Sequence, residues 1–316
     1  MTDLLIIGAG TAGLTAAIYG TRAGMSVKVI ENAIYGGQVI ASPSIENYPG
    51  MPGVSGADFI VNLYKQAKDF GAEILYETIH SANLAGDIKQ IVTSRGVHQA
   101  NTVIIATGAK PRRLAVPGEA DWIGRGIAFC ATCDGAFYKG KDVAVIGGGN
   151  VAIGDALLLS DLCRTVTVVH RSSSFKAEQV QVERLKAKEN VRLLVDTTVK
   201  AIDGNTVLKK IAIESKVTGE RSELPVAGIF IAIGAEPNNT IFAPELHLDQ
   251  SGYVLAGENC HTNLPGVFAA GDTRTKKVRQ LVTAAADGAV SALAAKEYLG
   301  SIQNQTDPNA KERDKV

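Results

Sequence analysis

The chain has 316 residues, of which 46% are hydrophobic and 20% charged, and its 32 basic side chains balance its 32 acidic ones. This length predicts about two domains, and the zero net charge removes the electrostatic argument for binding nucleic acid or an acidic membrane face. Four cysteines are too few for a disulfide-stapled secreted scaffold, and no run approaches the ~18 apolar residues of a membrane span. The first residues also lack the basic region of a signal peptide. We therefore expect a globular α/β protein of the cytoplasm.

The first strong pattern is a glycine-rich turn near the N-terminus. The apolar run 4–7 ends in Gly8–Gly13, a helix-favouring stretch covers 14–23, and a second apolar run at 27–30 ends in Glu31. In a strand–turn–helix–strand unit, such glycines permit a tight turn, the close approach of a pyrophosphate and close helix packing. The free N–H groups at the start of the helix attract the pyrophosphate, and the acid accepts a hydrogen bond from a ribose 2′-OH. The pattern predicts a site for FAD or NAD.

A pair of cysteines follows in the middle of the chain, in the run Cys130–Asp134. A C-x-x-C is either half of a metal site or a redox dithiol. A zinc site needs about four ligands, whereas Cys163 stands alone and Cys260 has only His261 beside it. We interpret Cys163 and Cys260 as packed side chains. The dithiol is favoured, because two intervening residues let the sulfurs close a small ring and Asp134 can move a thiol proton. The alternative for Asp134 is a turn acid before Gly135.

A second glycine turn repeats the pattern of the first. The run 143–146 ends in Gly147–Ala152, a helical stretch covers 153–161, and the run 166–169 ends in His170-Arg171. Neutral or positive donors at this point suit a 2′-phosphate and leave an unmodified ribose without its acceptor. The second turn therefore predicts a site for NADP.

The duplication predicts an α/β protein with two Rossmann-like dinucleotide-binding domains of three layers (ββα), the second inserted into the first. Three further glycine turns follow buried apolar runs, and Pro111 and Pro237 come shortly after the first two of these turns, where we expect the chain to cross between domains. The polar tail from Gln303 is expected to be disordered. The expected domains are 1–113 with 240–316 for FAD, and 114–239 for a pyridine nucleotide and the cysteine pair.

These motifs, in this order, resemble those of the low-molecular-weight bacterial-type thioredoxin reductases, which form class II of the flavoprotein pyridine-nucleotide-disulfide oxidoreductases. The resemblance covers residues 1–300 and rests on Gly8–Gly13, Glu31, Gly36-Gly37-Gln38, Ile45–Gly50, Ala131–Gly135, Gly147–Ala152, Ala269–Asp272 and Arg279-Gln280. It implies FAD, NADPH and a homodimer. It also implies a disulfide that receives two electrons at the flavin and then swings out to thioredoxin, with Cys130 attacking the substrate, Cys133 facing the flavin and Asp134 as acid and base.

The turns and the resemblance together define the expected nucleotide contacts. Those for FAD are Gly8, Gly10, Thr11, Ala12, Gly13, Glu31, Asn32, Gly36, Gly37, Gln38, Asn47, Thr107, Gly108, Gly271, Asp272, Arg279, Gln280 and Leu281. Those for NADP are Gly147, Gly149, Asn150, Val151, His170, Arg171, Lys176 and Gly234. No metal ligands are expected.

One departure from the family pattern concerns the electron donor. NADPH-using members carry His-Arg-Arg and a later arginine, whereas this chain has Ser172 after Arg171, Lys176 at the later position, and Gly154 in place of a usual glutamate. Each lost guanidinium removes a bidentate phosphate contact. NADPH is favoured, and NADH, reduced ferredoxin or a flavin carrier are the alternative donors.

Two other classes share the double dinucleotide fold. One is a flavin oxidase or a ferredoxin–NADP reductase-like enzyme, and the other is a redox-sensing flavoprotein without turnover. The C-x-x-C argues against the first class, because those reactions need no dithiol.

Overall fold

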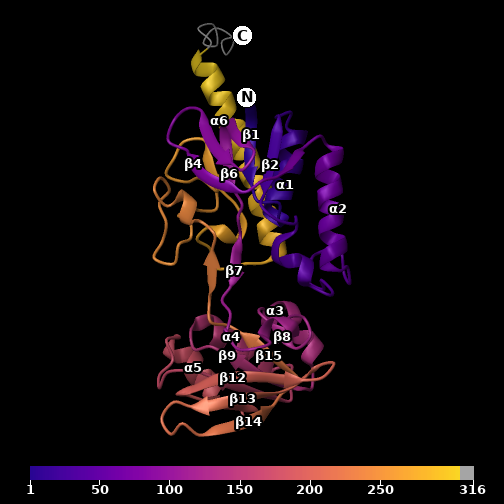
Figure 1. Ribbon diagram of the computed structural model, residues 1–316, viewed down its shortest axis with the longest axis vertical. Coiled ribbons are helices and arrows are strands. Elements are labelled where there is room, and N and C mark those ends of the chain that lie inside the picture. Colours follow the sequence, from indigo (N-terminus) through magenta and orange to yellow (C-terminus); the bar gives the residue numbers. More distant parts are fainter. Residues whose placement is uncertain (307–316) are drawn as a thin grey trace. The chain divides into compact units, whose positions relative to one another are not determined.

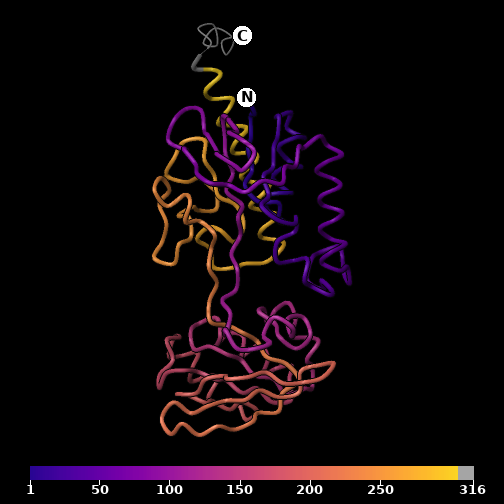
Figure 2. Tube along the Cα trace, in the orientation of Figure 1, coloured from indigo at the N-terminus to yellow at the C-terminus, as the bar shows by residue number. Residues whose placement is uncertain are grey.

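The computed structural model describes residues 1–306. The chain forms two compact units, one made of Met1–Lys110 and the segment from Glu236 onwards, the other of Pro111–Ala235 (Figure 1). The two passages between the units lie in β7 (Ala109–Pro111) and β16 (Ala235–Pro237), which pair as a two-stranded sheet (Figure 2).

The first unit contains a seven-stranded sheet in the order β3-β2-β1-β6-β5-β4, with β17 also paired to β6. The strands β1, β2, β3, β6 and β17 run parallel, and β5 is antiparallel to both of its neighbours, β6 and the edge strand β4. Their bounds are β1 Thr2–Ile7, β2 Val27–Glu31, β3 Glu73–Tyr76, β4 Ile79–Asn83, β5 Lys89–Thr93, β6 Gly96–Ile105 and β17 Val267–Ala269.

Both faces of this sheet are buried, because alternate residues of β1 point to opposite sides. Leu4 and Ile6 join one core with the helices, and Leu5 and Ile7 join a second core on the other face. The helices of the unit are α1 Thr11–Arg22, α2 Gly56–Asp69 and α6 Leu281–Thr306, with short 3₁₀ turns η1 Gly37–Ala41, η4 Thr240–Phe242 and η5 Gly271–Thr273.

The second unit has three layers. Its five-stranded parallel sheet, β11-β10-β9-β15-β8, lies between helices and a three-stranded antiparallel sheet, β12-β13-β14. Val143 and Val145 of β9 face the helix-side core, and Ala144 and Ile146 face the core shared with the antiparallel sheet. The bounds are η2 Glu119–Trp122, β8 Ile127–Ala128, α3 Ala131–Asp134, η3 Gly135–Tyr138, β9 Asp142–Ile146, α4 Asn150–Ser160, β10 Thr165–Val169, α5 Gln179–Lys186, β11 Val191–Leu194, β12 Thr197–Gly204, β13 Leu208–Ser215, β14 Arg221–Pro225 and β15 Gly228–Ile231.

The predicted α/β class is confirmed, with two units built on parallel sheets and the second interrupting the first. The assignment of one nucleotide to each domain stays a prediction. Of the tail expected to be disordered, α6 includes Gln303 and continues to Thr306, and the remainder lies outside the described residues. No helix within residues 1–306 is long and apolar enough to cross a membrane.

Candidate active site

The first glycine turn connects β1 to α1 and is tightly packed on one side only. Gly8 has φ +106°, and a Cβ there would lie 2.4 Å from the Ala106 carbonyl oxygen. A Cβ on Gly13 would lie 1.8 Å from the Gly8 carbonyl oxygen. Around Gly10, by contrast, nothing lies within 4 Å of the Cβ position. The turn therefore leaves open space beside the uncapped start of α1 at Thr11, where a phosphate meets free N–H groups.

Glu31 ends β2 and reaches back to this turn. One carboxylate oxygen accepts the Ala9 N–H at 2.9 Å and the other accepts the Ala33 N–H at 3.1 Å. Each oxygen keeps a second acceptor position, so the carboxylate is oriented and still able to accept a ribose hydroxyl. Asn32 is exposed directly after this strand.

The segment after β2 also lies against the turn. A Cβ on Gly37 would be 3.9 Å from the Gly10 Cα, and the Gln38 side-chain amide donates to the Ala109 carbonyl oxygen. Gly108, with φ +66°, follows β6 beside this contact. Residues predicted from distant parts of the sequence are thus brought together here.

The segment before α6 completes the same region. A Cβ on Gly271 would lie 2.8 Å from the Ala12 Cβ at the start of α1. The Asn47 amide donates to the Gln280 side-chain oxygen at 3.1 Å, and Leu281 is the first residue of α6. These contacts therefore join predicted FAD residues from separate stretches of the first unit.

Two buried polar atoms in this segment test whether a cofactor fits. Asp272 Oδ1 and Arg279 Nε have no hydrogen-bond partner among the described residues. Burial raises the pKa of Asp272, and the Arg279 guanidinium lies 4.1 Å from the centre of the Tyr253 ring. Buried polar groups are normally satisfied, so these two atoms indicate a polar ligand. The residues present fit polar groups of a bound nucleotide cofactor, and their predicted contacts with the ribityl chain and ring of a flavin stay a prediction.

Asn239 supports the site and was missed at the sequence level. It is 1% exposed, and its side-chain oxygen accepts the hydroxyls of Thr107 at 3.0 Å and Thr273 at 2.6 Å. Its amide donates to the carbonyl oxygens of Gly252 and Thr273. It thereby ties the end of β6 to the loop that carries Asp272. No local pattern marks such a residue, because its partners are distant in sequence.

In the second unit, Cys130 and Cys133 form a disulfide, with Cα atoms 5.3 Å apart. β8 leads directly into the pair, and α3 starts with Cys130 as its cap, the Sγ accepting the Cys133 N–H at 3.1 Å. Both cysteines are half-buried. The sulfurs are bonded to one another, which supports the redox dithiol over the metal half-site.

Asp134 directly follows the pair and its pKa is raised to about 6 by burial. Its backbone N–H donates to the Cys130 carbonyl oxygen at 3.0 Å, which holds it at the C-terminal end of the single turn of α3. A carboxyl that titrates near neutral pH can both give and take a proton. This property is what a thiol–disulfide exchange requires of the predicted acid and base.

The second glycine turn has the same construction as the first. Gly147 has φ +151° and a Cβ there would lie 2.3 Å from the Ala232 carbonyl oxygen, whereas nothing lies within 4 Å of the Gly149 Cβ position. Helix α4 begins at Asn150 without a side-chain cap, and Val151 is 67% exposed. Gly234 has φ +101°, and its carbonyl oxygen accepts a hydrogen bond from the Arg112 N–H at 3.0 Å.

His170 packs into the second turn. It is 8% exposed, a Cβ on Gly148 would lie 2.3 Å from its Nδ1, and its Nε2 lies 3.1 Å from the Ser174 carbonyl oxygen. The Lys176 N–H donates to the Gly148 carbonyl oxygen at 2.8 Å. The structure therefore places the imidazole beneath the loop 170–176, and its ring fixes the loop on the turn.

Three cations lie on or beside this loop. Arg171 and Lys176 are exposed, and Lys216, directly after β13, donates from Nζ to the Arg171 carbonyl oxygen at 3.1 Å. None of the three forms an ion pair within residues 1–306. The Lys216 N–H also donates to the Asp196 carbonyl oxygen at 2.7 Å. Sequence reasoning missed Lys216, because only the folded antiparallel sheet brings it to the loop.

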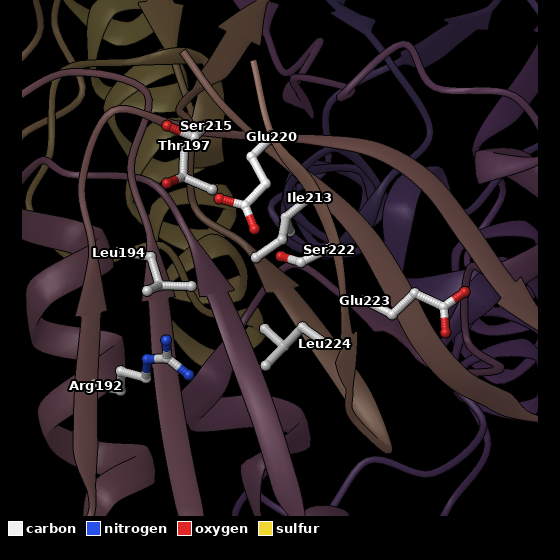
Figure 3. A pocket seen from close by; sticks show the side chains of 9 residues that line it. All are labelled: Arg192, Leu194, Thr197, Ile213, Ser215, Glu220, Ser222, Glu223 and Leu224. Carbon is white, nitrogen blue, oxygen red and sulfur yellow. The ribbon is translucent and has the colours of Figure 1, made fainter. Parts of the chain in front are cut away.

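A separate cavity of about 280 Å³ lies on the second unit between β11 and the antiparallel sheet (Figure 3). It contains none of the predicted site residues. Its lining residues are Arg192, Leu194, Thr197, Ile213, Ser215, Glu220, Ser222, Glu223 and Leu224.

Comparison with known proteins places this geometry in a family. The pyridine nucleotide-disulphide oxidoreductase family model matches residues 2–288. Thioredoxin reductase of Treponema pallidum is 40% identical over 96% of this chain and 98% of its own length. That of Mycolicibacterium smegmatis is 39% identical over 94% and 96%. The crystal structure of thioredoxin reductase from Streptococcus pyogenes superposes with a TM-score of 0.91 at 38% identity, over 95% of this chain and 99% of its own.

The predicted family resemblance is thereby confirmed, with the fold and the paired cysteines in agreement. Membership implies a flavin, a pyridine nucleotide and a disulfide-exchange reaction. The chain belongs to the pyridine nucleotide-disulphide oxidoreductase family and, within it, to the thioredoxin reductases.

Proposed function

We propose that this protein is an FAD-containing thioredoxin reductase that uses NADPH as its electron donor. The observation that carries the proposal is the Cys130–Cys133 disulfide with the titratable carboxyl of Asp134 beside it. Bound FAD supplies the chemistry that passes two electrons from a nicotinamide to a disulfide.

The protein's own residues then carry out thiol–disulfide exchange. Once the Cys130–Cys133 disulfide has been reduced to two thiols, the Cys130 thiolate attacks one sulfur of the thioredoxin disulfide and forms a mixed disulfide. The other thioredoxin sulfur leaves as a thiolate. Cys133 then attacks Cys130, which closes the Cys130–Cys133 bond and releases the second thioredoxin thiol. Asp134 takes up the Cys130 proton as that thiolate forms and delivers it to the first thioredoxin thiolate, and the proton that Cys133 loses goes to the second thioredoxin sulfur. The order of the two cysteines follows the family resemblance.

The choice of NADPH is supported by the three unpaired cations at the loop 170–176. Arg171, Lys176 and Lys216 offer positive charge where the second turn would present a ribose 2′-phosphate. Ser172 favours the alternative donors, NADH, reduced ferredoxin or a flavin carrier, because it replaces a guanidinium of the family pattern.

The donor is tested by mixing the yellow protein anaerobically with NADPH, NADH or reduced ferredoxin. Prompt bleaching of the flavin absorbance by NADPH is the expected result. Bleaching by ferredoxin alone would establish the alternative donor. A protein that carries no flavin after purification and takes up none on reconstitution would overturn the proposal itself.

The disulfide is tested with Cys133→Ser. We expect FAD to remain bound and thioredoxin reduction to be abolished, since no intramolecular disulfide can form. Cys163→Ser is the matched control, because Cys163 is a buried free thiol in the same unit. Full thioredoxin reduction by Cys133→Ser would refute this mechanism. Wild-type protein without any turnover would support the redox-sensing flavoprotein.

We further propose that the protein acts as a homodimer in the cytoplasm. This rests on the family resemblance, and sedimentation of the purified protein tests the dimer.

A further inference from the structure

A single buried carboxylate on α6 holds the segment that carries Asp272 and Arg279. Asp287 is 5% exposed and Arg274 is 1% exposed. Asp287 Oδ1 accepts one Arg274 Nη at 2.8 Å, and Oδ2 accepts Arg274 Nε at 2.8 Å and Lys276 Nζ at 2.9 Å. Oδ2 also accepts the Gly271 N–H at 2.8 Å. All four donors come from residues 271–276, so one side chain secures this whole segment to the helix.

The segment is held on its other side by the first glycine turn. Gly271 has φ +78°, and a Cβ there would lie 2.8 Å from the Ala12 Cβ. At Gly288, next to Asp287 on α6, a Cβ would lie 2.3 Å from the Ala12 carbonyl oxygen. Asp287 therefore lies where α6 crosses the start of α1. The position of the segment and the position of the turn are set at the same contact.

The charges make this carboxylate hard to replace. Burial opposes ionisation of Asp287, but the hydrogen bonds from Arg274 and Lys276 outweigh it, so that its pKa is lowered. Two buried cations share this one buried carboxylate, with Glu258 3.5 Å from Arg274 but 95% exposed. A neutral amide in its place would leave both cations underpaired and would point N–H donors at donors.

One of the two atoms left without partners lies within residues 271–276, and the other belongs to a residue that is hydrogen-bonded to them. The first atom, Oδ1, belongs to Asp272, the residue after Gly271. The second, Nε, belongs to Arg279, whose Nη donates to the Arg274 carbonyl oxygen at 3.4 Å. A movement of Gly271 or Arg274 would displace both atoms.

We propose that Asp287 is a positioning residue for the flavin, which acts through Gly271 and Arg274 to aim Asp272 and Arg279 at the cofactor. This inference rests on the proposed FAD site. Asp287 itself is directed at Arg274, Lys276 and the Gly271 N–H.

The test compares Asp287→Asn with Glu77→Gln. Glu77 is a matched buried carboxylate of the same unit, 6% exposed, and it accepts the Thr93 hydroxyl at 2.5 Å and pairs with His98 at 2.7 Å. Within residues 1–306, none of its side-chain hydrogen bonds reaches the segment 271–280. Each apoprotein is titrated with FAD, the dissociation constant is measured by flavin fluorescence, and the visible spectrum of the bound flavin and the apoprotein melting temperature are recorded.

We expect Asp287→Asn to weaken FAD binding by roughly ten- to a hundredfold and to shift the visible spectrum of the flavin that still binds. Glu77→Gln is expected to keep the wild-type dissociation constant and spectrum, even where its melting temperature falls. Should Asp287→Asn fail to fold, Lys276→Met removes one donor, keeps the Arg274 pair, and is expected to weaken FAD binding by a smaller factor.

Wild-type affinity and spectrum in Asp287→Asn, or equal losses of affinity in both carboxylate variants, would overturn the inference. In both cases the wild type still binds FAD, so the proposed function stands. A wild type that binds no FAD would instead remove the proposed function.

Discussion

Replacing Asp134 by asparagine is expected to make the protein more stable at alkaline pH while it destroys activity. Burial raises the pKa of this carboxyl from 3.8 to about 6, so the folded protein disfavours the ionised form. The stabilising contribution of the neutral acid is complete below the unfolded pKa and is lost as the pH rises through about 6. A neutral amide keeps that contribution at every pH.

The magnitude follows from the pKa. At about 1.36 kcal/mol for each pH unit, the difference corresponds to about 3 kcal/mol, and to about 1–2 kcal/mol once solvent screening at this half-buried side chain is allowed for. Asp134→Asn is therefore expected to raise the free energy of unfolding by about 1–2 kcal/mol at pH 8, and the gain should vanish below about pH 4. Turnover with thioredoxin should fall by about a hundredfold or more, which is typical of a lost acid–base group.

The measurement is urea unfolding followed by circular dichroism at several pH values, together with steady-state reduction of thioredoxin. Asp142 in the same unit is the control with the opposite sign, because the hydrogen bond from Arg164 lowers its pKa to about 2. Its contribution is present above the unfolded pKa and is lost as the pH falls through about 2, so Asp142→Asn should destabilise at pH 8. A stability gain in Asp134→Asn that grows as the pH falls, or full turnover, would refute the reasoning.

Two further substitutions test the nucleotide turns. Gly13→Ala places a Cβ 1.8 Å from the Gly8 carbonyl oxygen and should abolish FAD binding. The control is Gly300→Ala on α6, where nothing lies within 4 Å of the Cβ position; it should raise the free energy of unfolding by up to ~1 kcal/mol. FAD retention by Gly13→Ala would contradict the close packing of the turn. Lys216→Met should weaken NADPH binding by about tenfold and leave NADH unchanged. Lys210→Met, on β13 and paired with Glu223, should affect neither, and equal losses for both nucleotides would rule out contact with a 2′-phosphate.

The parts of the protein that could be predicted from sequence are those in which one short segment carries both the geometry and the chemistry. Gly8 and Gly13 must lack a Cβ because the backbone of neighbouring segments fills that space, and a spacing rule captures this requirement. Cys130 and Cys133 are close enough in the chain for the spacing alone to bring their sulfurs together.

The parts that could not be predicted depend on neighbours far away in the chain. Asn239, Asp287 and Lys216 all act on segments that they reach only after folding. The packing of His170 was also beyond sequence reasoning. The imidazole lies against Gly148, in space that is available only because residue 148 lacks a side chain.

The interruption of the first unit has a consequence for biosynthesis. Residues 111–235 are continuous, so this unit can be complete as soon as it has left the ribosome. The first unit lacks β17 and α6 until the chain is almost finished, and until then the β6 edge and the apolar side chains under α6 have no partners. Nascent chains stalled before residue 267 should therefore depend on chaperones through their first hundred residues, while their inserted unit is already folded.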